Sequence, residues 1–179
     1  MNNNSLLVSV MLLSACYSAG VNAEIVREER AVSGFEAVEV SGAGTIELTR
    51  GSSESLVIEA DSDVLDTIET RVEDGVLHIG RTTWSWFTFG RSKPIVYHLQ
   101  FETLNSLGLS GSIKAVADSM TGDRLSIRVS GSGGLVIEEV QAKEFKLSTS
   151  GSGSINVKSL EADDFDGRIS GSGRIDIGG

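Results

Sequence analysis

The residues best suited to bind a ligand lie in one short aromatic run, residues 84–89. The run contains both tryptophans and two of the six phenylalanines of the chain, as Trp84, Trp86, Phe87 and Phe89. Basic residues flank it on both sides, so rings and cations together would suit contact with a sugar, a peptide or a component of a cell envelope. The competing and favoured interpretation is structural: the run folds back to cover a face or an edge of the protein. These four aromatic residues are nevertheless the candidate binding residues of the sequence.

Two groups of aspartates have the close spacing that a calcium site requires. They are Asp61, Asp63 and Asp66, and Asp163, Asp164 and Asp166. Neither group lies in a glycine-containing twelve-residue ligand loop, and aspartate is common at turns and helix starts for its own hydrogen bonds. His78 and His98 alternate with apolar neighbours, so both are predicted to point outward into solvent rather than to form a metal pair. We therefore expect no metal and no cofactor.

An enzyme that cleaves polysaccharides, of the β-helix lyase or hydrolase type, is the alternative function. Such chemistry needs paired carboxylates, or a basic residue beside acids, on one face of the protein. Val136, Asn156 and Asp176 occupy equivalent outward positions in the repeat described below, and their chemistry differs. No catalytic residue is predicted. The favoured function is a non-enzymatic one, in surface interaction or envelope assembly, with an unknown protein or glycan as partner.

Residues 1–23 look like a targeting segment, with an apolar stretch from Leu6 to Leu13 followed by small residues. Two cleavage sites compete within it. The sequence Leu13-Ser14-Ala15-Cys16 resembles the lipobox of bacterial lipoproteins, in which Cys16 would be diacylated and become the mature N-terminus. Cleavage after Ala23 would instead release a mature chain beginning at Glu24. Either site predicts export, to the periplasm, the outer membrane or the cell surface. Only processing at the lipobox would add a membrane contact, through a lipid anchor on Cys16.

Composition favours a single β-rich domain over residues 24–179. The chain has 179 residues, of which 40% are hydrophobic, and this fraction is ample for one core. Twenty-one glycines and one proline are typical of a turn-rich β protein. The 15 basic and 25 acidic residues give a net charge of -10, which opposes binding to nucleic acid or to an anionic lipid surface.

The elements that would position these side chains follow a 20-residue repeat. Ser-Gly pairs recur at Ser110, Ser130, Ser150 and Ser170, and the last three are doubled to Ser-Gly-Ser-Gly. Apolar residues keep the same period, for example at Leu125, Phe145 and Phe165. A fixed period of this length is the signature of a stacked repeat architecture.

The apolar alternation changes parity within each unit, from odd positions at Leu135 and Ile137 to even ones at Val140 and Ala142. A strand side chain changes face where the strand bends, so each unit is predicted to contain three inward-facing runs joined by corners. This pattern predicts a parallel β-helix, or β-solenoid, with regular rungs of about 20 residues over 107–179. An antiparallel meander is the competing architecture, but it does not explain the parity change.

The half before Ser110 is predicted to be a less regular β region, with irregular rungs over residues 33–106. Ser41 is followed by Ile46 and Leu48 at the spacing of the later units, which indicates a first isolated rung. Asp74-Gly75 predicts a tight hairpin, and residues 61–68 would allow one helical turn. Residues 95–101 alternate as a further strand.

Several of these stretches together resemble a known family. They are Gly34-Phe35, residues 38–44, Glu59-Ala60-Asp61, residues 74–79 and the Ser-Gly-Ser-Gly series. Over roughly residues 33–177 the sequence resembles the family of putative auto-transporter adhesin, head GIN domain proteins. The resemblance implies an exported bacterial β-solenoid that is named for adhesion and has no established catalytic residues to carry over.

The last rung ends with Arg174-Ile175-Asp176-Ile177-Gly178-Gly179. A stacked rung leaves main-chain N-H and C=O groups unpaired on its outer side unless another segment covers them. We therefore expect either a longer natural chain or pairing of this edge with a second molecule. Ile127, Leu147, Ile155 and Ile175 are all predicted to be buried.

Overall fold

The computed structural model describes residues 25–81 and 94–179. Cys16 and the aromatic residues Trp84, Trp86, Phe87 and Phe89 lie outside the described residues, so their predicted roles stay predictions. The strands are β1 (Ile25–Arg30), β2 (Ala37–Arg50), β3 (Ser55–Asp61), β4 (Ile68–Glu73), β5 (Val76–Arg81), β6 (Val96–Phe101), β7 (Ser106–Gly131), β8 (Gly134–Gly151), β9 (Ser154–Gly171) and β10 (Arg174–Ile177), with one short helix, α1 (Ser62–Leu65), after β3. The all-β prediction is confirmed.

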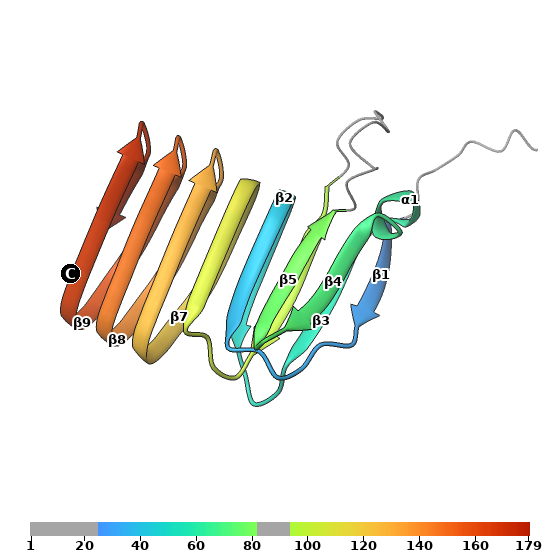
Figure 1. The fold of residues 1–179 in the computed structure, drawn as a ribbon, viewed down its shortest axis with the longest axis horizontal. Coiled ribbons are helices and arrows are strands. Elements are labelled where there is room, and N and C mark those ends of the chain that lie inside the picture. Colours follow the sequence, from blue (N-terminus) through green and yellow to red (C-terminus); the bar gives the residue numbers. More distant parts are fainter. Residues whose placement is uncertain (1–24, 82–93) are drawn as a thin grey trace, which may run out of the picture.

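These strands form one mixed sheet that does not close. Its order is β1-β3-β6-β2-β7-β8-β9-β10, with β5 also paired to β2, and β4 paired to β5. Figure 1 shows the strands side by side along the long axis of the molecule, with β1 at one end and the C-terminus at the other. In the described parts of the chain, no helix is long and apolar enough to cross a membrane.

Strands β7, β8, β9 and β10 pair in parallel at the 20-residue period of the sequence. Leu125 lies opposite Phe145, which in turn lies opposite Phe165. Ile155 lies opposite Ile175 in the last pair of strands. This register confirms the parallel stacking of successive units and makes the antiparallel meander wrong for this half of the chain. We refer to residues 134–153 as the middle unit and to residues 154–173 as the last unit.

Burial within a unit changes parity where the sequence predicts a bend. In the middle unit Leu135 and Ile137 are buried, Glu138 and Glu139 are both exposed, and Val140 is buried again. Figure 1 shows that the long strands curve back on themselves rather than run straight. The bend keeps apolar side chains directed to the interior although their sequence parity has changed.

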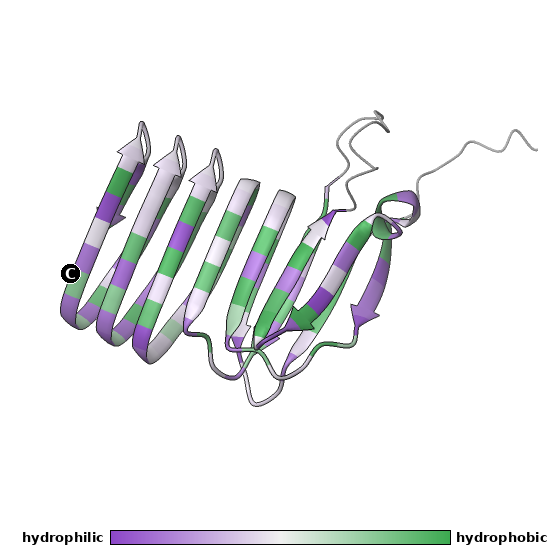
Figure 2. Ribbon diagram, viewed as in Figure 1, coloured by the Kyte–Doolittle hydropathy of each residue, from purple (hydrophilic) through white to green (hydrophobic). Residues whose placement is uncertain are grey.

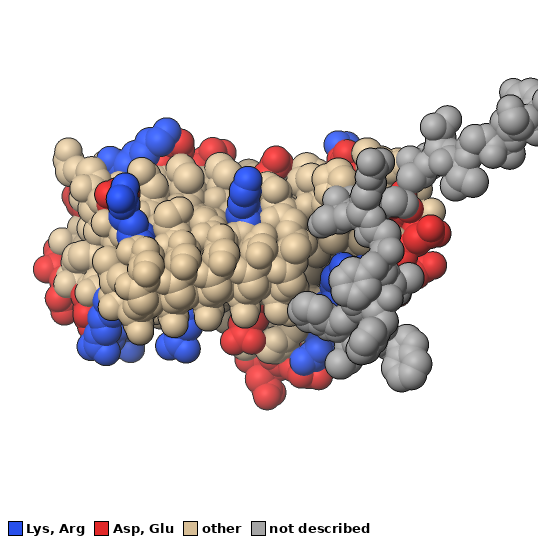
Figure 3. Space-filling view, turned by 90° about the horizontal axis from the view of Figure 1, so that it is seen from above, with Lys and Arg blue, Asp and Glu red and all other residues tan. Residues whose placement is uncertain are grey.

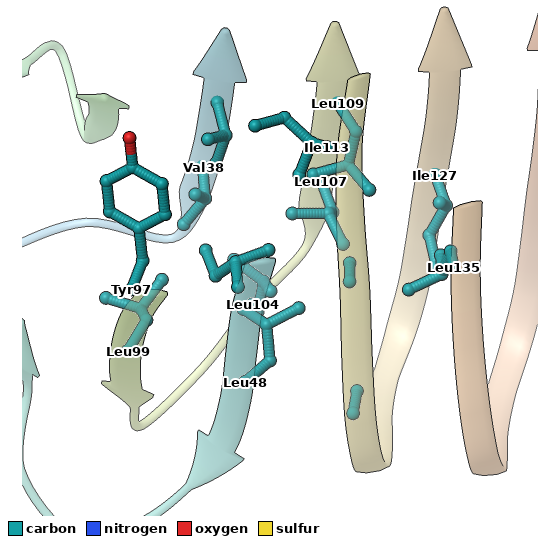
Figure 4. Packing of buried hydrophobic residues seen from close by; sticks show 14 of the residues in the cluster. Val38, Leu48, Tyr97, Leu99, Leu104, Leu107, Leu109, Ile113, Ile127 and Leu135 are labelled. Carbon is teal, nitrogen blue, oxygen red and sulfur yellow. The ribbon is translucent and has the colours of Figure 1, made fainter. Parts of the chain in front are cut away.

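One continuous hydrophobic core runs through the stack. Figure 2 shows hydrophobic and hydrophilic residues alternating along the strands, and Figure 4 shows inward side chains of neighbouring strands, among them Val38, Leu107 and Ile113, within this core. Ile127, Leu147 and Ile155 are buried, as predicted. The prediction for Ile175 was wrong in degree: this side chain is half-buried, because β10 has a strand on one side only among the described residues.

Strand β2 is the first copy of the repeated unit, as the sequence predicted. It pairs with β7 in parallel, with Ser41 opposite Ser110. On its other edge the beginning of β2 pairs with β5 and its end pairs with β6, so two separate strands take the place of one preceding unit. This division explains why the 20-residue period is lost in the N-terminal half.

Local signals in that half are also confirmed. Asp74 and Gly75 have φ of 50° and 77°, as the two central residues of a type I′ hairpin require, and they join the antiparallel strands β4 and β5. Asp61 caps α1 by accepting a hydrogen bond from the N-H of Asp63 at 3.3 Å. The first aspartate group therefore starts a helical turn, the structural role that was expected of it.

A column of stacked glycines holds the corners of the units together. Gly111, Gly131, Gly151 and Gly171 all have positive φ, between 95° and 104°, which other residues rarely adopt. A Cβ atom on Gly131 would lie under 3.0 Å from the carbonyl oxygen of Gly111. That same oxygen accepts a hydrogen bond from Ser132 at 2.9 Å. Glycine at this place is therefore required both by the backbone conformation and by the close contact between units.

Candidate functional site

Outward side chains beside the Ser-Gly corners form a polar surface on one side of the stack. Because inward and outward residues alternate, the register brings equivalent outward residues into rows that cross the strands. One row consists of serines, with Ser41 opposite Ser110, and Ser130 opposite Ser150, itself opposite Ser170. A second row lies two residues before these serines and contains Glu39, Gly108, Arg128, Ser148 and Arg168. It continues from Glu39 to His78 of β5 and then to Arg71 of β4.

The second row contains a hollow of about 330 Å³ over β5, β2 and β7. Its lining includes Glu39, Arg71, His78, Gly108 and Arg128. Glu39 lies opposite Gly108 in the sheet. Since Gly108 has no side chain, the surface is lowered there beside Arg128.

A second hollow, of about 690 Å³, lies next to the first. Its lining includes Arg128, Ser148 and Arg168, with Ser148 opposite both arginines on the neighbouring strands. Arg128 and Ser130 line both hollows, so the two join into one depression. We call this depression the arginine groove and define it by Arg71, His78, Gly108, Arg128, Ser130, Ser148 and Arg168.

Carboxylates lie beside three of the four basic side chains of the arginine groove. Arg71 lies 3.1 Å from Glu73, and His78 Nδ1 lies 3.3 Å from Glu39 Oε2. Arg168 contacts Asp166 at 2.9 Å. Within residues 25–81 and 94–179, no carboxylate lies within ion-pair distance of Arg128. Arg128 is therefore the side chain in this groove whose charge is available to a ligand.

The face that carries the Ser-Gly corners is largely uncharged. Figure 3 looks down on it and shows a broad band of neutral residues from which a few basic side chains project, with acidic residues gathered at its margins. The middle of this face therefore carries little acidic charge, although the net charge of the chain is -10.

His98 lies at a different place, on the outer surface over β2, β3 and β6. Its Nδ1 is 2.9 Å from Glu47 Oε2, and its Nε2 is 3.5 Å from Glu59 Oε2. Arg27 also contacts Glu59, at 2.8 Å, and this hydrogen bond is the largest cause of a lowered pKa for Glu59. The outward direction of His98 was predicted correctly, but its description as a simply solvated side chain was wrong, because two carboxylates flank it.

Metal binding has no support in the described ranges, where no group of three or more His, Cys, Asp or Glu side chains is arranged to hold a metal ion. In the second aspartate group, Asp166 pairs with Arg168 across one intervening residue. The structural role expected of the second group fits this ion pair.

An acidic hollow of about 630 Å³ lies at the opposite end of the strands, near the β4–β5 hairpin. Glu36, Glu54, Asp74 and Glu102 line it. Glu54 accepts hydrogen bonds from the N-H groups of Gly34 and Phe35, and Glu36 accepts one from the side chain of Asn105 at 2.8 Å. Two of the four carboxylates therefore fix the loops around β2.

Sequence reasoning placed the candidate site on the aromatic run and missed the arginine groove. The run lies outside the described residues, so the structure neither joins it to the groove nor separates it from the groove. A signal for the groove was present, because Arg128 and Arg168 are two periods apart with Ser148 between them. The contribution of Arg71 and His78 needs the strand order, which has no period in the sequence.

Residues 34–179 match the model of the family described as putative auto-transporter adhesin, head GIN domain. The chain belongs to this family. The resemblance drawn from residues 33–177 is thereby confirmed, with slightly different bounds. A comparison with curated proteins finds no match.

Solved structures of similar fold include three from two Parabacteroides species. A putative adhesin from Parabacteroides merdae has a TM-score of 0.62 at 17% identity, covering 87% of this chain and 82% of that one. A putative adhesin from Parabacteroides distasonis has a TM-score of 0.59 at 19% identity, covering 87% and 74%. A putative lipid binding protein from the same species has a TM-score of 0.55 at 16% identity, covering 87% and 97%. These likenesses establish a common fold.

Proposed function

We propose that this chain is a non-enzymatic, adhesin-like interaction module exported to the cell surface or envelope, with the arginine groove as its contact surface. The groove is the observation that carries the proposal. It is open, extends from β4 and β5 onto the regular part of the stack, and contains Arg128, a cation with no carboxylate partner in the described chain. Membership of a family named for adhesion agrees with this assignment.

The scaffold in this proposal is a parallel β-solenoid. Its support is the 20-residue parallel register from β7 to β10, together with the change of burial parity at Glu138 and Glu139. In such a scaffold each unit fixes its neighbours by main-chain hydrogen bonds, so outward residues are held at constant spacing. A surface of this kind suits recognition of an extended ligand.

The alternative is a carbohydrate-active enzyme. Cleavage of a glycosidic bond by the common mechanisms needs two carboxylates across the scissile bond. The lining of the arginine groove contains one carboxylate, Glu39, and it is engaged with His78. The acidic hollow has four, and it is therefore the place where turnover would arise under the alternative.

Export is the second part of the proposal, and it rests on the targeting segment. Intact-mass measurement of the protein made in its native cell distinguishes the two processing sites. An acylated Cys16 as first residue establishes a lipoprotein, whereas a mature terminus at Glu24 establishes a soluble exported protein. An unprocessed Met1 terminus in a cytoplasmic fraction contradicts export.

The function is tested by measuring retention of envelope-fraction components on immobilised residues 24–179, beside a panel of lyase and hydrolase substrates. We expect saturable retention without turnover, and we expect Arg128→Gln to weaken it. Glu102→Gln, in the acidic hollow, is the matched control and should leave retention unchanged. Turnover that survives repurification and disappears in Glu102→Gln would establish the enzyme instead.

The aromatic run has a test of its own in the same assay. If Trp84, Trp86, Phe87 and Phe89 contact the partner, replacing both tryptophans by alanine should weaken retention without a large change in melting temperature. A large fall in melting temperature at unchanged retention would show that the run covers the protein structurally.

A further inference from the structure

The arginine groove has a composition that selects one class of ligand. We infer that it binds an acidic glycan, a chain of sugars bearing carboxylate or sulfate groups, with the guanidinium of Arg128 as the main anion contact. This inference rests on the proposed binding function and adds to it the chemistry of the ligand.

The charge of Arg128 provides the first step. Its guanidinium has no carboxylate partner in the described chain, while Arg71, His78 and Arg168 around it are already paired. A guanidinium presents a planar fork of donors that fits a carboxylate or sulfate with two parallel hydrogen bonds. The groove therefore has one strong anion position at its centre, where the two hollows join.

The hydroxyl row provides the second step. Ser130 lines both hollows, with Ser110 beside it in the first and Ser150 and Ser170 in the second. Each hydroxyl can both donate and accept a hydrogen bond, which matches the hydroxyl groups of a sugar. A polyhydroxylated sugar chain with spaced anionic groups is complementary to this combination of one free cation and several serines.

The position of the groove on the sheet provides the third step. It lies on a sheet face, where the main-chain N-H and C=O groups are used in the parallel ladder. A peptide that binds by strand addition needs a free edge, which this face does not offer. Acidic peptide motifs are bound by clusters of arginines, whereas here Arg71 and Arg168 are already paired with carboxylates and Arg128 alone is unpaired among the described residues, so an acidic glycan is favoured.

Room for the ligand is the fourth step. Gly108 and Ser148 are the small residues on either side of Arg128 in its row. Arg128 and Arg168 lie two strands apart, about 9.6 Å at the usual strand spacing. A chain lying across the strands can thus place one anionic group at Arg128 and extend past Ser148, while Arg168 is already paired with Asp166.

The test is calorimetric titration of residues 24–179 with four probes of similar length, three glycans and one peptide. Polygalacturonate and dextran sulfate carry carboxylate and sulfate groups on sugars, and neutral dextran carries neither. Poly-glutamate is a fourth probe that presents carboxylates on a peptide. We expect saturable binding of at least one of the two acidic glycans, weaker binding of poly-glutamate and no binding of neutral dextran.

Three variants locate the binding. Arg128→Gln should weaken it by about tenfold or more, as loss of a charge-assisted contact does. Gly108→Thr should block it by filling the first hollow; a Cβ there makes only ordinary contacts, the nearest at 3.5 Å from Glu39, so the fold should persist. Arg50→Gln is the matched control, because Arg50 is exposed, lines neither hollow and should change affinity less than twofold.

The outcomes are distinct. Equal losses in Arg128→Gln and Arg50→Gln would reduce the binding to general charge attraction and overturn the inference. Preference for poly-glutamate, or no binding of either acidic glycan, would also overturn it. If envelope components are still retained through Arg128 in those cases, the proposed function stands and the ligand class alone is wrong.

Discussion

The middle unit and the last unit have nearly the same pattern of residues but differ in exposure. Phe145 of the middle unit is fully buried, whereas Phe165, its equivalent in the last unit, is 40% exposed. Thr149 is buried, and its equivalent Ile169 is 53% exposed although it is the more apolar of the two.

The difference shows that burial in this molecule comes from the neighbouring units. Phe145 lies between Leu125 and Phe165, and its ring centroid is 5.6 Å from that of Phe165. The last unit has the middle unit on one side and, beyond β10, no further strand on its other side in the described chain. An identical local pattern therefore contributes much less to stability at the end of the stack than within it.

The largest expected effect is from a charge placed between two units. Ile155 is fully buried and stacked between Leu135 and Ile175, so Ile155→Asp should lower the free energy of unfolding by about 4 kcal/mol or more. Ile177→Asp, at 38% exposure, should cost about 1 kcal/mol. Urea denaturation of both variants measures the contrast. Similar losses would show that the end of the stack is as well covered as its middle.

The paired phenylalanines give the next contrast. Phe145→Ala should destabilise by about 3 to 5 kcal/mol, as loss of a buried aromatic ring does. Phe165→Ala should cost about 1 to 2 kcal/mol, from its partial burial and its contact with the Phe145 ring. Thermal unfolding of the two variants provides the measurement, and a larger loss for Phe165→Ala would contradict the comparison.

Replacing the corner glycines by alanine tests whether the last unit can shift outward to accommodate a new Cβ atom. Gly131→Ala should cost about 1 to 3 kcal/mol, because the residue has positive φ and its new Cβ would crowd the Gly111 carbonyl. Gly171 has the same conformation and the same crowding against Gly151. We expect a smaller loss for Gly171→Ala, because the last unit can shift outward. Equal losses of unfolding free energy in the two variants, measured by chemical denaturation, would mean that the last unit cannot shift outward.

Tyr97 in β6 gives a pH-dependent measure of burial in the N-terminal half. Burial raises the pKa of Tyr97 to about 12. The stability that the folded state gains from holding this phenol neutral is fully present below pH 10 and is lost as pH rises from 10 towards 12. Tyr97→Phe should therefore lose less stability than the parent over that range. Unfolding free energies measured between pH 9 and 11 provide the check, and identical pH profiles would show that Tyr97 is accessible to water.

The smallest effect on stability is expected at the outer edge of β10, where the sequence predicts either a longer natural chain or pairing with a second molecule, of which a second copy of the chain is the case that Ile177→Pro tests. The main-chain N-H groups of Arg174 and Gly178 donate to the carbonyl oxygens of Gly153 and Val157, so the alternate N-H group of Ile177 points to the open side. Ile177→Pro should abolish self-association with little change in stability. Light scattering after size-exclusion chromatography measures the self-association of the parent and the variant. A parent protein that stays monomeric at high concentration would refute the pairing.

Sequence predicted the regular half of the fold well because one period determines both register and burial there. The spacing of Leu125, Phe145 and Phe165 was enough to align three strands. The antiparallel pairing of β1 with β3 was not predicted, because it joins Ile25 to Asp61 without any repeat between them. His98 was misjudged for the same reason: its partner Glu47 is 51 residues away, on a strand that only the fold brings close.

The direction of the main-chain hydrogen bonds has a mechanical consequence. These bonds run along the long axis of the stack, between strands that cross it, while β1 and the C-terminus lie at its two ends (Figure 1). A pull on the two ends therefore applies the full force to every ladder at once instead of dividing it among them, so the weakest ladder breaks first. Under tension the stack should open unit by unit from the C-terminal end, extending a long way at low force. A molecule anchored at one end and attached at the other would yield gradually instead of snapping free.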